Sequence, residues 1–515
     1  MREQFKNTNL INLLFYFVII AVFITGIYIR IRYYLAGVPM WIDEILLASN
    51  LTDCGFKDLF APLDGFLKTP PLFFLCAMTL RKLFGINELT LRFIPFVLSI
   101  ASLFGFFFLL KENIKNKIGI LSGLFMFSFC VPLIYFSAEF KQYGCDVFFA
   151  IVLLLLYNRL DFNNLKPKKI ILYTLGSILF VFFSFPAIIL IPAIILSKII
   201  GKKFNPKILW VFGGLIFAGL SLLLYDIKTY TFLKNYWNSA GKGFSHIPNL
   251  KFITGFVQDA CNYFVYNFHS GFVIVILCLI TAGLVVLFKE NKNKAFMVLL
   301  TFFFAIISSA VNAYPLSPKL ALYMLPMFLL LITKFFDITE FFNKNYTRII
   351  FNICIVFILI FTFGIKIPYL NINQNQIIYY NQGIKNRNKS IEDRLAVKNI
   401  CLKILKNYKS GNKILASEEF LYSLKYYGAV NNYDKKIDII PYAETDETRL
   451  SDYTTDFAQD FIKDNKTNLF IVGRNNERFF TCPNLEILEE IIAQNKLKYK
   501  KYTYKDIYLV EINQI

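Results

Sequence analysis

Long apolar runs separated by short polar connections fill the chain from Leu10 to Ile367 and then stop. A helix rises about 1.5 Å per residue, so a run of about 20 apolar residues can cross the ~30 Å hydrocarbon core of a bilayer. We therefore predict a polytopic α-helical membrane domain over 1–367. Its eleven predicted spans are 10–32, 92–110, 118–138, 144–158, 169–185, 187–200, 208–225, 268–288, 295–311, 320–336 and 349–367.

Two apolar segments need a separate interpretation. The first follows Arg2 and Lys6, as in a secretion signal, but its apolar region is too long and no small-x-small cleavage site follows it. We predict that it is a retained span. The segment 70–84 reaches only about 22 Å as a helix, which is short of a full crossing. Counting it as a span would also invert every later basic connection, so we predict an interfacial helix there.

The charges of the connections predict the orientation of the chain in the membrane. Every second connection is short and basic, and these connections are 111–117, 159–169, 198–207, 289–294 and 344–348. Basic loops tend to stay in the cytoplasm. The N-terminus is then cytoplasmic, and eleven spans place the chain from Pro368 onward outside. The outer connection 226–267 also carries four Lys, although the rule is weaker for longer loops.

The pattern from Pro368 onward is that of a small soluble α/β domain, over 368–515. Short apolar runs at 413–417 and 468–473 are typical of buried strands, and a hairpin is predicted at 499–504 with 507–512. The predicted helices are 418–428, 447–465 and 485–495. No glycine-rich phosphate-binding loop follows the first strand, so the sequence predicts no nucleotide site in this domain.

Composition supports a membrane protein and argues against a nucleic-acid-binding protein. The apolar fraction is 56%, above the roughly 45–50% of soluble domains. The net charge is +20, but the chain from Pro368 onward has 22 Lys and Arg against 19 Asp and Glu, so most of the excess lies between the spans. The nine Cys show no CxxC spacing, so neither a zinc site nor a redox motif is indicated.

The predicted topology gathers polar residues on the outer face, at Asp43, Glu44, Lys68, Arg92, Glu139, Lys141, Tyr143 and Lys319. Asp43 and Glu44 follow the first span among apolar neighbours, where ionised groups lose solvation and are usually paired or functional. A loop charge or a helix cap would explain them equally well. Lys68 and Lys319 could likewise be interfacial anchors or partners of a lipid phosphate.

The run Ser137–Asp146 lies between two strongly apolar stretches. If it opens the fourth span, Glu139, Tyr143 and Asp146 share one helical face, while Lys141 points elsewhere. A carboxylate one turn inside a span, as Asp146 would be, normally faces protein or a cavity. The alternative is a turn whose charges reach water.

Four motifs, in this order, resemble a known family. They are Asp43-Glu44, the Pro-Pro-Leu opening 70–72, the run 83–92 (LFGINELTLR) and the run 137–143 (SAEFKQY). The order is similar to that in bacterial members of the GT-C superfamily, in the dolichyl-phosphate-mannose–protein mannosyltransferase-like family that includes the lipid A aminoarabinose transferases. The chain departs from the family pattern at Thr69, where His or Lys is usual, and at Lys319, where Arg is usual.

The resemblance implies transfer of a sugar from a polyprenyl-phosphate carrier to an acceptor hydroxyl on the outer face of a bacterial cytoplasmic membrane. The acceptor would be a glycolipid, a polysaccharide or a protein. It implies catalytic roles for Asp43, Glu44 and Glu139, with Asp43 as the base. Phosphate-binding candidates are Lys141, Lys319, Lys68 and Arg92, and substrate-binding candidates are Tyr143 and Asp146. These cations make a catalytic metal unnecessary, and no cofactor beyond the lipid-linked donor is expected.

Two other classes remain open from the sequence. A transporter or flippase of a lipid-linked glycan would also be polytopic, but transporters tend to show internal repeats and polar, broken helices at mid-membrane depth. Here the polar residues concentrate at one face, and no repeat is evident. A non-catalytic protein that keeps the GT-C-like fold as a scaffold would not need Asp43, Glu44, Glu139 and Lys141.

Overall fold

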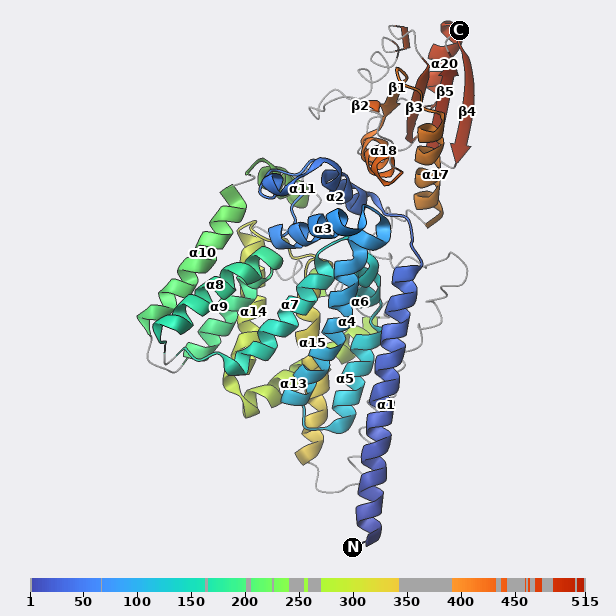
Figure 1. Ribbon diagram of the computed structural model, residues 1–515. Coiled ribbons are helices and arrows are strands. Elements are labelled where there is room, and N and C mark those ends of the chain that lie inside the picture. The colour runs from blue at the N-terminus through green and yellow to red at the C-terminus, as the bar shows by residue number, and fades with distance from the viewer. Residues whose placement is uncertain are drawn as a thin grey trace. The chain divides into compact units, whose positions relative to one another are not determined.

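The computed structural model is mostly helical, with one small sheet near the C-terminus (Figure 1). It describes residues 2–341 and 391–513. Excepted are 66, 163–164, 201–204, 225–226, 240–253, 258–269, 432–436, 442–458, 460–461, 464–467, 475–484 and 505–506. The predicted span 349–367 and the predicted domain boundary at 367/368 lie outside these residues.

The chain divides into two compact units. The first, here called the helical unit, comprises Met1–Gly37, Phe56–Thr79 and Leu91–Asn388. The second, the C-terminal unit, comprises Val38–Gly55, Leu80–Thr90 and Lys389–Ile515, so it includes two segments from the N-terminal part of the chain.

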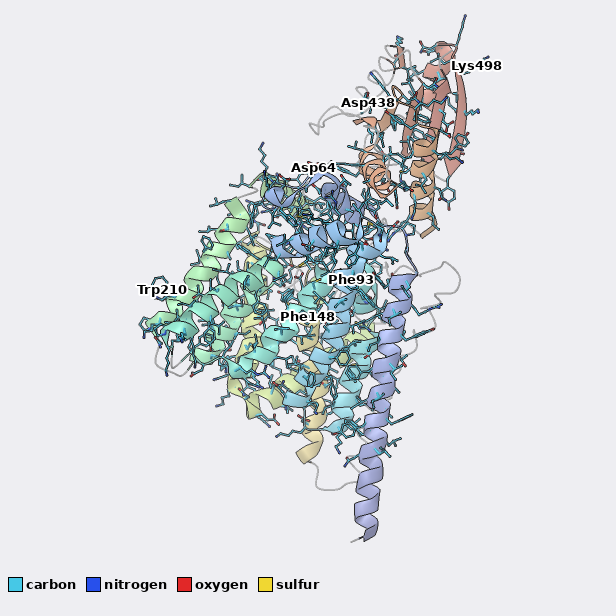
Figure 2. All side chains as sticks on the ribbon, viewed as in Figure 1. Asp64, Phe93, Phe148, Trp210, Asp438 and Lys498 are labelled. Atoms are coloured by element: carbon cyan, nitrogen blue, oxygen red, sulfur yellow. The ribbon has the colours of Figure 1, made fainter. Side chains whose placement is uncertain are left out.

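The apolar runs form the long helices of the helical unit. These are α1 (Arg2–Leu35), α4 (Glu88–Asn113, its first three residues in the C-terminal unit), α5 (Lys117–Phe129), α6 (Val131–Tyr135), α7 (Tyr143–Leu156), α8 (Pro167–Phe183), α9 (Ala187–Ile199), α10 (Leu209–Leu224), α13 (Ser270–Glu290), α14 (Lys292–Ala310) and α15 (Leu325–Lys334). Large apolar side chains cover the outside of these helices, as expected of a lipid-facing surface. Trp210, at the edge of the bundle in Figure 2, is 69% exposed.

Four helices of the described chain are long and apolar enough to cross a membrane, namely Asn12–Leu35, Glu88–Asn113, Pro206–Leu224 and Lys292–Ala310. A fifth crossing results if the helix pair Lys117–Phe129 and Val131–Ala138, bent by 50°, is one span. The bend falls at Cys130, whose extended backbone precedes the helix start at Val131-Pro132. The chain is therefore a multi-pass membrane protein, and the count of eleven spans stays a prediction.

Shorter elements complete the helical unit. Helix α3 (Pro71–Phe84) confirms a helix in the predicted interfacial segment, and its part in the helical unit runs across the end of the bundle (Figure 1). Helix α11 (Ile227–Ser239) lies in the predicted outer connection 226–267, where we expected no helix. Short 3-10 turns are η1 (Phe56–Asp58), η2 (Phe136–Ala138), η3 (Tyr157–Arg159), η4 (Pro206–Ile208), η5 (Leu322–Met324) and η6 (Phe335–Phe341).

The C-terminal unit holds a five-stranded mixed sheet of order β2-β1-β3-β5-β4. Its strands are β1 (Lys413–Ala416), β2 (Asp438–Pro441), β3 (Leu469–Arg474), β4 (Lys498–Tyr504) and β5 (Ile507–Asn513). Strand β1 pairs in parallel with β2 and β3, whereas β5 is antiparallel to β3 and β4. The predicted small α/β domain and its hairpin are thus confirmed for the described residues.

Among the described residues of this unit, helices α2, α17, α18 and α20 accompany the sheet. Helices α18 (Glu418–Val430) and α20 (Leu485–Gln494) follow the prediction closely, while the predicted helix 447–465 lies largely outside the described residues. Helix α17 (Ile391–Asn407) and strand β2 were not predicted. Helix α2 (Ile42–Asp53) comes from the N-terminal part of the chain and packs against α18.

Candidate functional site

The acidic pair lies in the first turn of α2, within the C-terminal unit, and its two carboxylates differ. Asp43 is partly exposed, whereas Glu44 is fully buried. Glu44 Oε2 accepts a hydrogen bond of 3.3 Å from the main-chain N–H of Trp41, the residue before the helix, as a glutamate at the third helical position commonly does. Glu44 Oε2 also lies 3.8 Å from Nη1 of Arg394 on α17. The Glu44 carboxylate is therefore engaged by the protein itself.

The run 137–146 is not one continuous helix. The short turn η2 ends before Glu139, which has an extended backbone, and α7 begins only at Tyr143. The expected shared face thus holds for Tyr143 and Asp146 but is wrong for Glu139. Gly144, in the first turn of α7, lies close to η2, and a Cβ added there would lie 2.9 Å from the carbonyl oxygen of Phe136.

Three charged residues of this run are buried in the helical unit. Glu139 is 2% exposed, Lys141 7% and Asp146 3%. Asp146 Oδ1 accepts a hydrogen bond of 2.7 Å from the Ser184 hydroxyl, which follows α8 and is itself buried. The expectation that Asp146 faces protein is confirmed. Buried charges of this kind require partners.

Helix α11 brings two of the candidate phosphate-binding lysines to one of its faces. Lys68 Nζ lies 5.7 Å from the ring centroid of Tyr230, and Lys319 Nζ lies 5.8 Å from that of Trp237. Tyr230 and Trp237 are seven residues apart, which is two helical turns, so they share a face. Both ammonium groups are within the ~6 Å range of cation–π attraction.

Each lysine has a further contact. Lys319 Nζ lies 5.9 Å from the ring centroid of Tyr143, so the structure joins two predicted site residues directly. Lys68 Nζ donates a 3.1 Å hydrogen bond to the carbonyl of Leu222, at the end of α10. Arg92 is 2% exposed on α4, where its charge acts on Tyr34 of α1. Tyr143, Lys319 and Lys68 therefore form a linked set around α11, which sequence reasoning did not anticipate.

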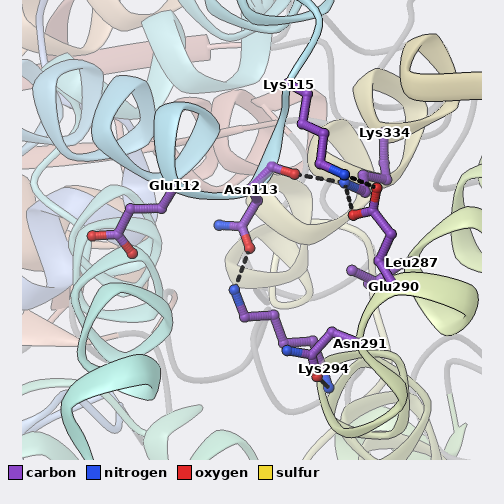
Figure 3. A pocket seen from close by; sticks show the side chains of 8 residues that line it. All are labelled: Glu112, Asn113, Lys115, Leu287, Glu290, Asn291, Lys294 and Lys334. Atoms are coloured by element: carbon purple, nitrogen blue, oxygen red, sulfur yellow. Dashed lines mark hydrogen bonds and ion pairs between the residues drawn. The ribbon is translucent and has the colours of Figure 1, made fainter. Parts of the chain in front are cut away.

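A polar pocket of about 430 Å³ lies at a different place in the helical unit (Figure 3). It is lined by the ends of α4, α13 and α15 and by the start of α14, including Asn113, Glu290 and Lys334. Asn113 is 21 residues from Arg92 along α4, or about 32 Å. None of the predicted site residues lines this pocket.

The lining groups of this pocket bind one another. Glu290 forms ion pairs with Lys115, at 3.0 Å, and with Lys334, while Lys334 also pairs with the buried Asp337 at 2.7 Å and donates to the carbonyl of Asn113. Burial raises the pKa of the Glu290 carboxyl, but hydrogen bonds from the two lysines outweigh this effect and lower the pKa. The network links the ends of α4, α13 and α15, so its role is structural.

Metal-ligating groups do not gather in the part of the chain that the structure describes. No three His, Cys, Asp or Glu side chains lie together there in a way that could hold an ion. The positive groups near the predicted site are Lys and Arg.

No family model and no curated protein matches the chain. Solved structures do resemble it. ArnT from Cupriavidus metallidurans bound to undecaprenyl phosphate gives a TM-score of 0.54 at 8% identity, over 96% of this chain and 98% of that chain. The apo oligosaccharyltransferase from Archaeoglobus fulgidus gives 0.51 at 12% identity, over 88% and 69%. Its complex with Zn and sulfate gives 0.50 at 12% identity, over 88% and 67%. At these identities the likeness concerns the fold alone, and it confirms the predicted GT-C resemblance at that level.

Proposed function

We propose that this protein is a membrane glycosyltransferase that moves a sugar from a polyprenyl-phosphate carrier to an acceptor hydroxyl. The observation that carries the proposal is the end-to-end fold likeness to ArnT, solved with undecaprenyl phosphate, in a chain that has the motif order described above. Fold alone does not define activity. The motif residues add the chemistry that the reaction needs.

The proposed reaction is a displacement at the anomeric carbon of the donor sugar. The acceptor oxygen forms a bond to that carbon, the bond from the carbon to the phosphate oxygen breaks, and the lipid phosphate leaves as an anion. The acceptor proton passes to a carboxylate base. We assign the base to Asp43, because it is the partly exposed member of the pair, whereas Glu44 is buried and bound by protein groups.

The leaving phosphate needs positive charge more than it needs a proton. We assign this role to Lys319, Lys141, Lys68 and Arg92, with Tyr143 and Asp146 near the sugar and Glu139 as a further catalytic carboxylate. Tyr230 and Trp237 would hold the Lys68 and Lys319 ammonium groups in place before the donor arrives. The Archaeoglobus fulgidus oligosaccharyltransferase was solved in complex with Zn and sulfate, whereas in this protein we assign the positive charge to the lysine and arginine side chains.

The basic connections support a definite sidedness for this reaction. We propose that the N-terminus and the basic connections are cytoplasmic and that residues 368–515 form an extracytoplasmic domain. Transfer would then occur on the outer face of a bacterial cytoplasmic membrane. The polar pocket at Lys334 would lie on the cytoplasmic side.

Loss of the glycan in a deletion strain tests the function. Mass spectrometry of surface glycans, lipids and proteins should reveal one missing sugar, which identifies donor and acceptor together. Accumulation of an untransported lipid-linked intermediate would instead indicate a flippase. An unchanged glycan profile would refute both assignments.

Two variants test the assigned base in that strain. Asp43→Asn should lower transfer by about 10²–10⁴-fold at unchanged protein level, because general-base catalysis is lost. Asp53→Asn is the matched control, since Asp53 ends the same helix and its side chain is 74% exposed. Full transfer by Asp43→Asn would overturn the assignment of the base.

A further inference from the structure

Helix α17 of the C-terminal unit carries an arginine that reaches the acidic pair. Arg394 Nη1 lies 3.8 Å from Glu44 Oε2 and donates a 3.2 Å hydrogen bond to the carbonyl of Pro39. We propose that Arg394 is a positioning residue for sugar transfer, which holds Glu44 and thereby the turn that carries Asp43. This inference rests on the proposed function.

The segment from Pro39 to Glu44 is held in place by the side chains of Arg394 and Glu44. Arg394 binds the main chain before α2 and the carboxylate inside its first turn, and that carboxylate returns to the main-chain N–H of Trp41. Asp43 lies between these attachment points. The backbone of Asp43 is therefore held at positions before and after it in the chain. Arg394, which holds it, lies about 350 positions later in the sequence.

Because the Arg394–Glu44 pair is buried, its loss should disturb the local structure more than the loss of a surface ion pair does. The Arg394 and Glu44 side chains are 3% and 0% exposed. Removing either charge from water is unfavourable, and the loss of Arg394 or Glu44 takes a counter-charge away from the other. Arg394 therefore favours the conformation in which Glu44 lies inside the unit. Such buried pairs contribute to structural specificity in some proteins, where they select one register over others.

Two other ion pairs of the same unit provide a comparison. Lys398, one turn after Arg394 on α17, binds Glu88 Oε1 at 2.7 Å. Lys425 of α18 binds Asp53 Oδ2 at 2.9 Å, at the last residue of α2. The Lys425 pair is exposed, with side-chain exposures of 31% and 74%, and exposed pairs contribute little. Lys425 therefore supplies a matched control on the far end of the same helix.

The consequence for catalysis concerns the placement of the base. A misplacement of about 1 Å can cost up to roughly 10²-fold in rate, because the reacting atoms must be aligned. Release of the first turn of α2 would move Asp43 without removing any group that binds the lipid phosphate. The turnover number should then fall while the KM for the donor stays nearly unchanged.

The experiment measures transfer by the full-length protein in nanodiscs, with the polyprenyl-phosphate sugar and acceptor identified from the deletion strain. Arg394→Gln should lower kcat by about 10–100-fold and change the donor KM by less than about threefold. Glu44→Gln should have a similar effect, and the double variant should be no worse than either single one, because both remove the same attachment. Lys425→Gln should retain kcat within about twofold.

A fluorescence measurement tests the attachment without using activity. The chain has three Trp, and the substitutions Trp210→Phe and Trp237→Phe leave Trp41 as its only tryptophan, whose emission is excited selectively above the absorption of tyrosine. In this background Arg394→Gln should shift the emission maximum of Trp41, whereas Lys425→Gln should not. If the wild-type protein shows no sugar transfer, the proposed function is refuted. A shift of the Trp41 emission in Arg394→Gln would still show that Arg394 holds the segment from Pro39 to Glu44.

Three outcomes would overturn the inference. Arg394→Gln could retain wild-type kcat, or it could lose kcat with no change at Trp41, which would place its effect elsewhere. Alternatively, the double variant could lose the product of the two single effects, which would show that Arg394 and Glu44 act independently. Arg394→Lys guards against simple misfolding, since it keeps the charge and should recover part of kcat.

Discussion

Gly283 on α13 faces Leu331 on α15 so closely that a Cβ added to the glycine would lie 1.9 Å from the Leu331 carbonyl oxygen. The neighbouring atom is main chain, so it cannot swing away as a side chain can. A second glycine, Gly123 on α5, approaches α15 from another helix, with its added Cβ 2.8 Å from Thr333 Cγ2. Small residues that let backbones come together are a common basis of helix association in membranes.

Gly283→Ala should therefore destabilise the helical unit by at least about 1–3 kcal/mol, the usual cost of an overpacked interior. Thermal unfolding of purified protein in detergent measures the effect. Gly213→Ala on α10 is the control, because an added Cβ there meets nothing within 4 Å and alanine favours a helix. Equal melting temperatures for the two variants would contradict the close approach.

The contact between Lys319 and Trp237 predicts an effect on donor binding. Trp237→Leu removes the ring that holds the lysine, so it should raise the donor KM by about 2–30-fold, the equivalent of about 0.5–2 kcal/mol of cation–π attraction. Phe232→Leu is a suitable control, since Phe232 lies on another face of α11 and is 42% exposed. A KM that responds equally to both substitutions would mean that Lys319 does not depend on Trp237.

Hydrophobic patterning predicted most helices of the helical unit, because the apolar runs begin and end close to where the helices do. The predicted span 169–185 became α8, and 187–200 became α9, each within about two residues. Charge patterning singled out residues that turned out to be buried, among them Glu44, Glu139 and Asp146. Both signals are local, and a single sequence is enough to show them.

The pairings within the site were not predictable in this way. Arg394 was missed although the apolar spacing from Ile391 onward fits a helix, because no local pattern says that it meets Glu44 about 350 residues earlier. The face of α11 was missed because the segment looked like a polar connection. Glu139 was placed on the wrong element because no local pattern marks the break between η2 and α7, across which Gly144 lies close to Phe136.

Chelation tests the expectation that lysine and arginine charges stabilise the leaving phosphate. We expect transfer to remain within about twofold after treatment with EDTA, because the ammonium and guanidinium groups of the candidate site supply the positive charge. Lys319→Met in the same assay should lower transfer by at least tenfold, which shows that the assay senses phosphate stabilisation. Loss of transfer with EDTA, restored by a divalent cation, would assign the role to a metal.

The ion-pair network around Glu290 predicts a pH-dependent contribution to the stability of the helical unit. Its ion pairs with Lys334 and Lys115 lower the pKa of the Glu290 carboxyl below its usual 4.5. A group whose pKa is lowered by folding stabilises the folded state above its unfolded pKa, and this contribution disappears as the pH falls through the folded pKa. Glu290→Gln should therefore lower the free energy of unfolding by about 1–2 kcal/mol at pH 7, which is less than the roughly 1.5–3 kcal/mol typical of hydrogen bonds to charged groups because the Glu290 side chain is 31% exposed.

Thermal unfolding of wild type and Glu290→Gln from pH 7 down to pH 3 measures this dependence. The difference between the two proteins should be constant near neutrality and shrink as the pH falls below 4.5, the usual pKa, because the carboxylate of the unfolded chain takes up its proton first. Glu112→Gln is the control, because Glu112 lines the same pocket but accepts an exposed hydrogen bond of 3.3 Å from the Asn158 side-chain amide. A difference that persists unchanged at pH 3 would show that the charge of Glu290 does not hold these helix ends together.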